Sequence, residues 1–246
     1  MARIISRSSV VCLLACAALL VAACARAPQT EAPAAPEPAP SPQVAAIRIV
    51  VLGDSLAAGL GLAEGEAFPA VLEVILRGNG HSVDVVNAGV SGDTSAGGLS
   101  RVDWVLQQPT DILVIELGGN DALRGQDLEN TESNLRQIVR RGRVGGTRVV
   151  LLGMDVPTNY GPAYSRQFSE MYVRIANEED AALVPAFVRE VGTDPILLQP
   201  DGLHPTAEGQ RRLAEILAPH LESFLARSDA PGADLEPPPD AAAPIR

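Results

Sequence analysis

The pattern of apolar and polar positions along the chain predicts an alternation of strands and helices. Short apolar runs bounded by turn-forming residues are typical of strands, and helical patterns lie between them. Such runs occupy residues 47–52, 83–86, 112–117 and 149–152, with a weaker one at 183–184. This alternation predicts a single-domain α/β fold: an open, mostly parallel sheet of about five strands with helices on both faces.

The last predicted helix has the clearest amphipathic pattern. Its apolar residues fall on one helical face, Leu213, Ile216, Leu217, Leu221, Phe224 and Leu225, and its charged residues lie outside it, Arg211, Arg212, Glu215 and Glu222. In open α/β sheets, ligands bind beyond the carboxyl ends of the strands. Residues that directly follow each predicted strand are therefore the candidates for chemistry.

Composition excludes several classes of protein. Aromatic residues make up only 3% of the 246-residue chain, so the core must be built from Val, Leu, Ile and Ala. All 19 basic residues are Arg, which removes both the P-loop lysine and a pyridoxal Schiff-base lysine. The formal net charge is −11 and no basic cluster is present, so no nucleic-acid partner is expected.

The amino-terminal residues have the build of an export signal. Arg3 and Arg7 precede an apolar run over residues 10–23, which is shorter than a membrane span and ends in small residues. The run closes with Leu20-Val21-Ala22-Ala23-Cys24, which resembles the lipobox of bacterial lipoproteins and implies lipidation of Cys24. Ordinary cleavage after Ala25 is the alternative.

The domain boundaries follow from composition. Residues 1–24 are expected to be a signal peptide of the lipoprotein type, and the Ala/Pro-rich residues 25–45 an extended linker. Residues 46–228 form the folded domain, and residues 229–246 a disordered tail. We expect an envelope lipoprotein that faces the periplasm, outer-membrane sorting being favoured in a two-membrane host, or a soluble periplasmic or secreted protein if Cys24 is not lipidated.

All three cysteines, Cys12, Cys16 and Cys24, lie in the first 24 residues. The folded domain therefore has no disulfide, no thiolate nucleophile and no cysteine-based zinc site. We expect its chemistry to need no metal or cofactor.

Polar blocks follow three of the predicted strands, and a fourth lies late in the chain. They are Gly53-Asp54-Ser55-Leu56, Asn87-Ala88-Gly89-Val90-Ser91-Gly92-Asp93-Thr94, Gly118-Gly119-Asn120-Asp121 and Asp201-Gly202-Leu203-His204-Pro205. Over residues 47–225 the chain resembles the SGNH, or GDSL, hydrolase family, whose four signature blocks appear here in order. Residues 91–95 and 117–125 most resemble its arylesterase, thioesterase and lysophospholipase branch. The resemblance implies a three-layer, flavodoxin-like architecture.

A serine hydroxyl needs a base within hydrogen-bonding reach, and the chain has three histidines. His81 follows the turn-forming segment Gly78-Asn79-Gly80, and His220 lies on the surface-flanking part of the last helix. His204 remains, with Asp201 close enough in the chain to hold its imidazole.

The resemblance, carried over residue by residue, implies Ser55 as nucleophile, His204 as base and Asp201 as the group that orients it. It also implies an oxyanion hole made of the Ser55 and Gly92 amides and the Asn120 side chain. Each residue has a simpler explanation. Asn120 can cap a turn, Gly92 can serve a left-handed backbone, and Asp201 with Gly202 is a good turn pair.

The expected function is a serine ester hydrolase that acts on acyl or aryl esters, with thioesters and lysophospholipids as further substrates. The partners implied are a small acyl-ester or lipid substrate and a membrane tether through Cys24, with no protein partner. A carbohydrate O-deacetylase and a non-catalytic binding lipoprotein are the alternatives.

Two further groups of side chains near the blocks are not expected to act chemically. The carboxylates Asp54, Asp93, Glu116 and Asp121 are expected to hold loop amides rather than to form a catalytic pair. The aromatic residues Tyr160, Tyr164 and Phe168 either line an acyl pocket or pack in the core or a lid.

Overall fold

The computed structural model describes residues 46–156 and 158–228. Five strands form one sheet in the order β2-β1-β3-β4-β5, and every adjacent pair is parallel. The strands are β1 (Ile47–Gly53), β2 (Val83–Gly89), β3 (Ile112–Glu116), β4 (Arg148–Leu152) and β5 (Ala182–Val184). The predicted fold class is therefore confirmed. The predictions for the signal peptide, Cys24, the linker and the tail lie outside the described residues.

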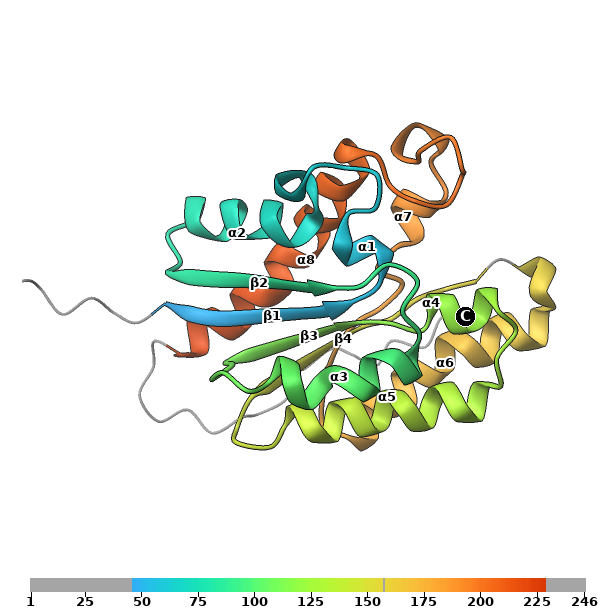
Figure 1. The fold of residues 1–246 in the computed structure, drawn as a ribbon, viewed down its shortest axis with the longest axis horizontal. Helices are drawn as coiled ribbons and strands as arrows, with labels where there is room; N and C mark the ends of the chain where they lie inside the picture. Colours follow the sequence, from blue (N-terminus) through green and yellow to red (C-terminus); the bar gives the residue numbers. More distant parts are fainter. Residues whose placement is uncertain (1–45, 157, 229–246) are drawn as a thin grey trace, which may run out of the picture. The chain divides into compact units, whose positions relative to one another are not determined.

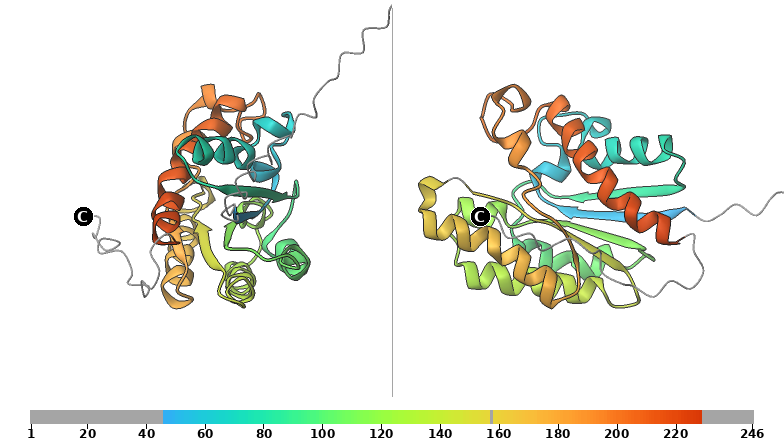
Figure 2. Two further views of the ribbon diagram at one scale, coloured as in Figure 1. Left: turned by 90° about the vertical axis from the view of Figure 1, so that its left-hand side faces the viewer. Right: turned by 180° about the vertical axis from the view of Figure 1, so that it is seen from behind.

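Helices cover both faces of this sheet, α2 and α8 on one face and α3, α5 and α6 on the other (Figures 1 and 2). The helices are α1 (Ser55–Ala58), α2 (Phe68–Gly78), α3 (Ser95–Val105), α4 (Gly119–Leu123), α5 (Leu128–Gly142), α6 (Pro162–Glu178), α7 (Arg189–Gly192) and α8 (Ala207–Ser228), with 3-10 turns η1 (Glu64–Glu66), η2 (Thr158–Tyr160) and η3 (Pro195–Leu197). Within the described ranges, no helix has the length and apolarity that a membrane crossing requires.

The apolar run at residues 49–52 of β1 has a direct physical reason. Ile49 and Val51 pack in the core that α2 and α8 cover, whereas Val50 and Leu52 pack in the core on the other face. Because successive side chains of a strand point to opposite faces, a strand with helices on both sides needs apolar residues at every position. On α8 the residues that face the sheet are the predicted ones, with Leu213, Leu217, Leu221 and Leu225 fully buried.

The strand register brings three of the polar blocks to one edge of the sheet. Gly53, the last residue of β1, is in register with Gly89 of β2 and with Glu116 of β3. The segments that follow these three residues therefore leave the sheet at the same level. The predicted site residues Ser55, Gly92 and Asn120 all lie in these segments.

Candidate active site

Ser55 lies in a tight turn between β1 and α1. Asp54 caps α1, since its Oδ1 accepts the Leu56 amide at 3.0 Å, and Ser55 is the first residue of the helix with 8% of its surface exposed. A Cβ atom at Gly53 would lie 2.5 Å from a Glu116 carboxylate oxygen and 2.6 Å from the Ala57 methyl. Only glycine fits there, so the turn that presents Ser55 depends on Gly53.

His204 and Asp201 meet Ser55 from a loop late in the chain. His204 Nε2 lies 3.0 Å from Ser55 Oγ, and His204 Nδ1 lies 2.7 Å from Asp201 Oδ2. The backbone amides of Leu203 and His204 donate to Asp201 Oδ1 at 2.9 and 3.0 Å. The His204 amide and ring, with the Leu203 amide, hold the pKa of Asp201 at about 2, so this carboxylate is ionised at neutral pH.

The His204 loop is fixed by its own backbone. Leu198 and Pro205 form an antiparallel bridge, and the Gln199 amide donates to the His204 carbonyl at 2.7 Å. The Gln199 side chain donates in addition to the Leu60 carbonyl at 2.7 Å, just beyond α1. The loop is thereby tied to the segment that carries Ser55.

Two backbone amides near the site are free to bind an anion. Neither the Ser55 nor the Gly92 amide donates a hydrogen bond to any of the residues described. Gly92 has a positive φ of 81°, a conformation that glycine adopts without strain, and its carbonyl accepts from Arg124 Nη2 at 2.7 Å. The Arg124 contact holds the Gly92 loop against the end of α4.

The Asn120 side chain is also joined to the Ser55 turn. Its Nδ2 donates to Asp54 Oδ2 at 2.9 Å, which occupies one of its two N–H bonds and leaves the other for a ligand. Asn120 follows Gly118 and Gly119 at the start of α4. Direct contacts thus join Ser55, His204 and Asp201, and Asn120 reaches the Ser55 turn through Asp54. Gly92 lies in the loop after β2, at the same edge of the sheet.

Arg101 is a further residue of the site that sequence reasoning missed. From α3 its guanidinium donates to the Gly53 carbonyl at 2.9 Å, to the Ala88 carbonyl at 2.7 Å and to Asp93 Oδ2 at 2.7 Å. It therefore ties the ends of β1 and β2 together. The prediction that Asp93 holds a loop amide is wrong, because its carboxylate pairs with Arg101; Asp54, Glu116 and Asp121 do accept backbone amides as predicted.

Gln210 on α8 is a second missed residue. It is 1% exposed, its Nε2 donates to the Leu56 carbonyl at 2.9 Å, and its Oε1 accepts the Phe68 amide at 2.9 Å. One side chain therefore joins α1 to the start of α2. A polar residue on the apolar face of α8 was the signal that sequence reasoning overlooked.

The aromatic residues after β4 divide between core and surface. Tyr160, Tyr164 and Phe168 form a stacked series with ring centroids 6.3 Å apart at each step. Phe168 is fully buried and continues the series to Tyr172, whose hydroxyl donates to the Leu117 carbonyl at 2.9 Å. Phe168 is therefore a core residue, whereas Tyr160 is 40% exposed.

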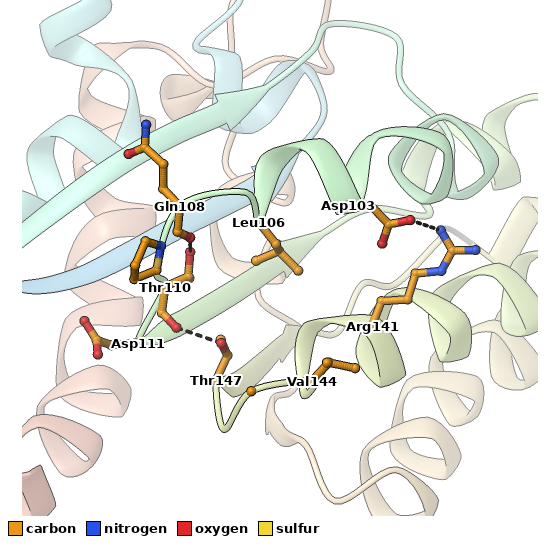
Figure 3. Close-up of a pocket in the computed structure, with 10 residues that line it drawn as sticks. Asp103, Leu106, Gln108, Thr110, Asp111, Arg141, Val144 and Thr147 are labelled. Carbon is orange, nitrogen blue, oxygen red and sulfur yellow. Dashed lines mark hydrogen bonds and ion pairs between the residues drawn. The ribbon is translucent and has the colours of Figure 1, made fainter.

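A hollow of about 510 Å³ lies at the other edge of the sheet, where β3 and β4 begin (Figure 3). Several of its polar groups bind one another: Arg141 pairs with Asp103 at 2.8 Å, and the Thr147 hydroxyl donates to the Thr110 carbonyl at 2.7 Å. Because Ser55 follows the carboxyl end of β1, this hollow is separate from the candidate active site.

Replacing Gly89 with alanine should displace α1 and lower both stability and activity. A Cβ atom there would lie 2.4 Å from the Ala58 nitrogen, which is backbone and cannot move aside as a flexible side chain would. We expect a loss of about 1 to 3 kcal/mol in the free energy of unfolding, measured by chemical denaturation. Gly192→Ala is the control, since no atom lies within 4 Å of its added Cβ. An unchanged free energy of unfolding in Gly89→Ala would contradict the expected clash.

Comparison with known proteins agrees with this geometry. Residues 51–212 match the model of the GDSL-like Lipase/Acylhydrolase family. The chain is 43% identical to Esterase TesA of Pseudomonas aeruginosa over 74% of this chain and 92% of that protein. It is 40% identical to Thioesterase 1/protease 1/lysophospholipase L1 of Escherichia coli K12 over 74% of this chain and 86% of that protein.

Solved structures give the same result. The crystal structure of TesA superposes with a TM-score of 0.70 at 42% identity, over 72% of this chain and 99% of that one. The matched region contains Ser55, Gly92, Asn120, Asp201 and His204. The chain therefore belongs to the GDSL-like lipase/acylhydrolase family.

Proposed function

We propose that this protein cleaves acyl and aryl esters by forming an acyl-enzyme on Ser55. As a member of its family the chain is an ester hydrolase, and the observation that carries the mechanism is the chain of contacts from Ser55 Oγ through His204 to Asp201, at 3.0 and 2.7 Å. Such a chain activates a hydroxyl that is otherwise a weak nucleophile.

In the first step His204 Nε2 takes the Ser55 proton while Oγ attacks the ester carbonyl, and the same proton is then given to the departing alcohol. In the second step His204 takes a proton from the water that attacks the acyl-enzyme, and it returns this proton to Ser55 Oγ as the bond to the acyl group breaks and the acid leaves. The ionised Asp201 keeps Nδ1 protonated and stabilises the imidazolium that forms in each step.

The negative charge that develops on the carbonyl oxygen is bound by the Ser55 and Gly92 amides and by the remaining N–H of Asn120. The two amides have no acceptor within the described ranges, so they need not break a protein hydrogen bond to bind it. These steps need no metal or cofactor.

Replacing Asn120 with alanine should lower kcat on the order of 10² to 10³, because one donor to the oxyanion is lost. KM should change little. The unfolding midpoint in urea measures whether the fold is kept. Asn134→Ala on α5 is the control, since its side chain donates to the Ser95 hydroxyl and not to the site. Turnover like that of the wild type in Asn120→Ala would remove Asn120 from the mechanism.

Exposed apolar side chains around the site favour acyl and aryl esters over acetylated sugars. Leu60, Val90 and Leu203 are each between 43% and 49% exposed. The Leu60 amide donates to the Ser55 carbonyl, the Val90 amide donates to the Gly53 carbonyl, and Leu203 precedes His204 directly. An apolar acyl or aryl group gains from covering such residues, whereas a sugar does not.

A panel of p-nitrophenyl esters from acetate to octanoate, with O-acetylated sugars beside it, tests this substrate class. We expect higher kcat/KM for the longer acyl chains than for acetate and for the sugars. Higher kcat/KM on the acetylated sugars would favour the O-deacetylase instead. Thioesters and lysophospholipids belong in the same panel, since a similar protein carries both activities in its name.

We also propose that the protein is exported and tethered to the membrane through Cys24, which lies outside the described residues. The apolar run that ends at Cys24 supports this. Metabolic labelling with a palmitate analogue should label the wild-type protein and not Cys24→Ala. Equal labelling of the two proteins would show that Cys24 is not the lipidated residue and would contradict the proposed anchor.

A further inference from the structure

Glu116 lies beneath the turn that carries Ser55 and has no exposed surface. It is the last residue of β3, and its Oε2 accepts the Asp54 amide at 3.0 Å and the Ala57 amide at 3.2 Å. These amides lie on either side of Ser55 in the chain. The side chain of Glu116 therefore holds both ends of the nucleophile turn.

The second carboxyl oxygen of Glu116 has a different environment. Oε1 is buried and meets no hydrogen-bond donor among the described residues. The neighbouring ionisable side chain is Asp54, which is 3% exposed and whose charge acts on Glu116. A buried carboxylate oxygen without a donor is costly, and two neighbouring buried carboxyl groups do not readily both ionise.

The charges around Glu116 and Asp54 favour a state in which the two carboxyl groups together keep one proton. Burial, followed by the charge of Asp54, raises the pKa of Glu116 well above its usual value. Burial also raises the pKa of Asp54, but the Leu56 amide, the Asn120 side chain and His204 act in the opposite direction there. Asp93 also faces Asp54, and Tyr172 is the further titratable group near both carboxyls. Asp54 is the better place for the single negative charge.

We infer that Glu116 is a positioning residue that stays protonated and donates its proton to the Asp54 carboxylate. Asp54 then accepts three hydrogen bonds: from Glu116, from the Leu56 amide and from Asn120 Nδ2. Through Asp54, Glu116 fixes the direction of the Asn120 amide, and through the two backbone amides it fixes Ser55. The effect on catalysis rests on the proposed function, whereas the protonation of Glu116 does not.

Three variants separate a neutral donor from a charged group. In Glu116→Gln the carbonyl can accept the two amides and the NH₂ can donate to Asp54, so we expect kcat within about threefold of the wild type and an unchanged pH profile. Glu116→Leu keeps the volume but loses every hydrogen bond, so kcat should fall on the order of 10²-fold with little change in KM. Glu170→Gln, on the exposed side of α6, controls for the loss of a charge.

Two kinetic results would overturn the inference. If Glu116→Gln loses as much activity as Glu116→Leu, the ionised carboxylate is needed, and the inference that Glu116 acts as a neutral donor is wrong. If both variants match the wild type in kcat, Glu116 does not position the site. Hydrolysis that persists in Ser55→Ala would instead count against the proposed function.

Infrared difference spectroscopy tests the proton without substrate. The spectrum of the wild type minus Glu116→Gln, recorded at pH 5 and at pH 8, should contain the carbonyl stretch of a protonated carboxyl group at both values. Carboxylate bands in its place at both values would show an ionised Glu116 and overturn the inference. This measurement decides the question even if Glu116→Leu fails to fold.

Discussion

Replacing Ser55 with alanine is expected to lower kcat on acyl esters by on the order of 10⁴-fold or more, because no other group can form the acyl-enzyme. Among the described residues, Ser55 Oγ contacts only His204, at 3.0 Å, and Gln210 and Asp54 hold the rest of α1 through its backbone. The fold should therefore be unchanged. Initial rates on p-nitrophenyl butyrate and the urea unfolding midpoint measure the two effects.

A fluorophosphonate probe gives an independent test of the same residue. The wild-type protein should be labelled with one equivalent, and Ser55→Ala should not be labelled. Ser133→Ala, on the exposed side of α5, is the matched control and should react like the wild type. Labelling of Ser55→Ala at the wild-type rate would assign the nucleophile to another residue.

Replacing Asp201 with asparagine is expected to have the second largest effect, a fall in kcat on the order of 10³ to 10⁴. The carboxylate accepts from His204 Nδ1 at 2.7 Å, whereas an amide NH₂ at this place would donate to Nδ1 and so put the ring proton on Nε2. His204 would then be unable to take the Ser55 proton. KM should change little.

Asp194→Asn is the matched control for this prediction. Asp194 Oδ1 accepts the Ile196 amide at 3.0 Å, as Asp201 Oδ1 accepts the Leu203 amide at 2.9 Å, but Asp194 has no contact with a histidine. Its amide variant should therefore keep the turn and the activity. Equal losses of kcat in the two variants would show that the loop backbone, rather than the histidine contact, carries the effect.

The strands could be predicted because a strand that is buried on both faces appears in the sequence as a short run of apolar residues. Their predicted and observed bounds differ by no more than one residue at every end except one, since β2 continues to Gly89 instead of ending at residue 86. Asn87, Ala88 and Gly89 are paired with the last three residues of β1, so the parallel partner sets the length of β2. The local pattern of apolar residues carries no information on this pairing, so it could not predict where β2 ends.

The residues that meet at the candidate site could be predicted because the four blocks are recognisable in the chain, whereas the residues that support them could not. Arg101 lies on α3 and Arg124 directly follows α4, and in the sequence both resemble ordinary solvent-exposed polar positions. Their roles depend on which carbonyl each guanidinium reaches, Gly53 and Ala88 for the first and Gly92 for the second. Those contacts exist only once the sheet has assembled, so the spacing of residues in the sequence cannot predict them.

The course of α8 has a practical consequence for handling the enzyme. The helix starts beside the His204 loop and crosses the face of the sheet, and near its end Glu222 accepts from Asn79, which precedes β2 (Figure 1). The amino end of β1 lies at this same edge. A bead, a fusion partner or an electrode surface joined directly to residue 46 or to residue 228 of the folded domain is thus attached at the edge opposite Ser55. Immobilisation at either residue should leave Ser55 open to substrate.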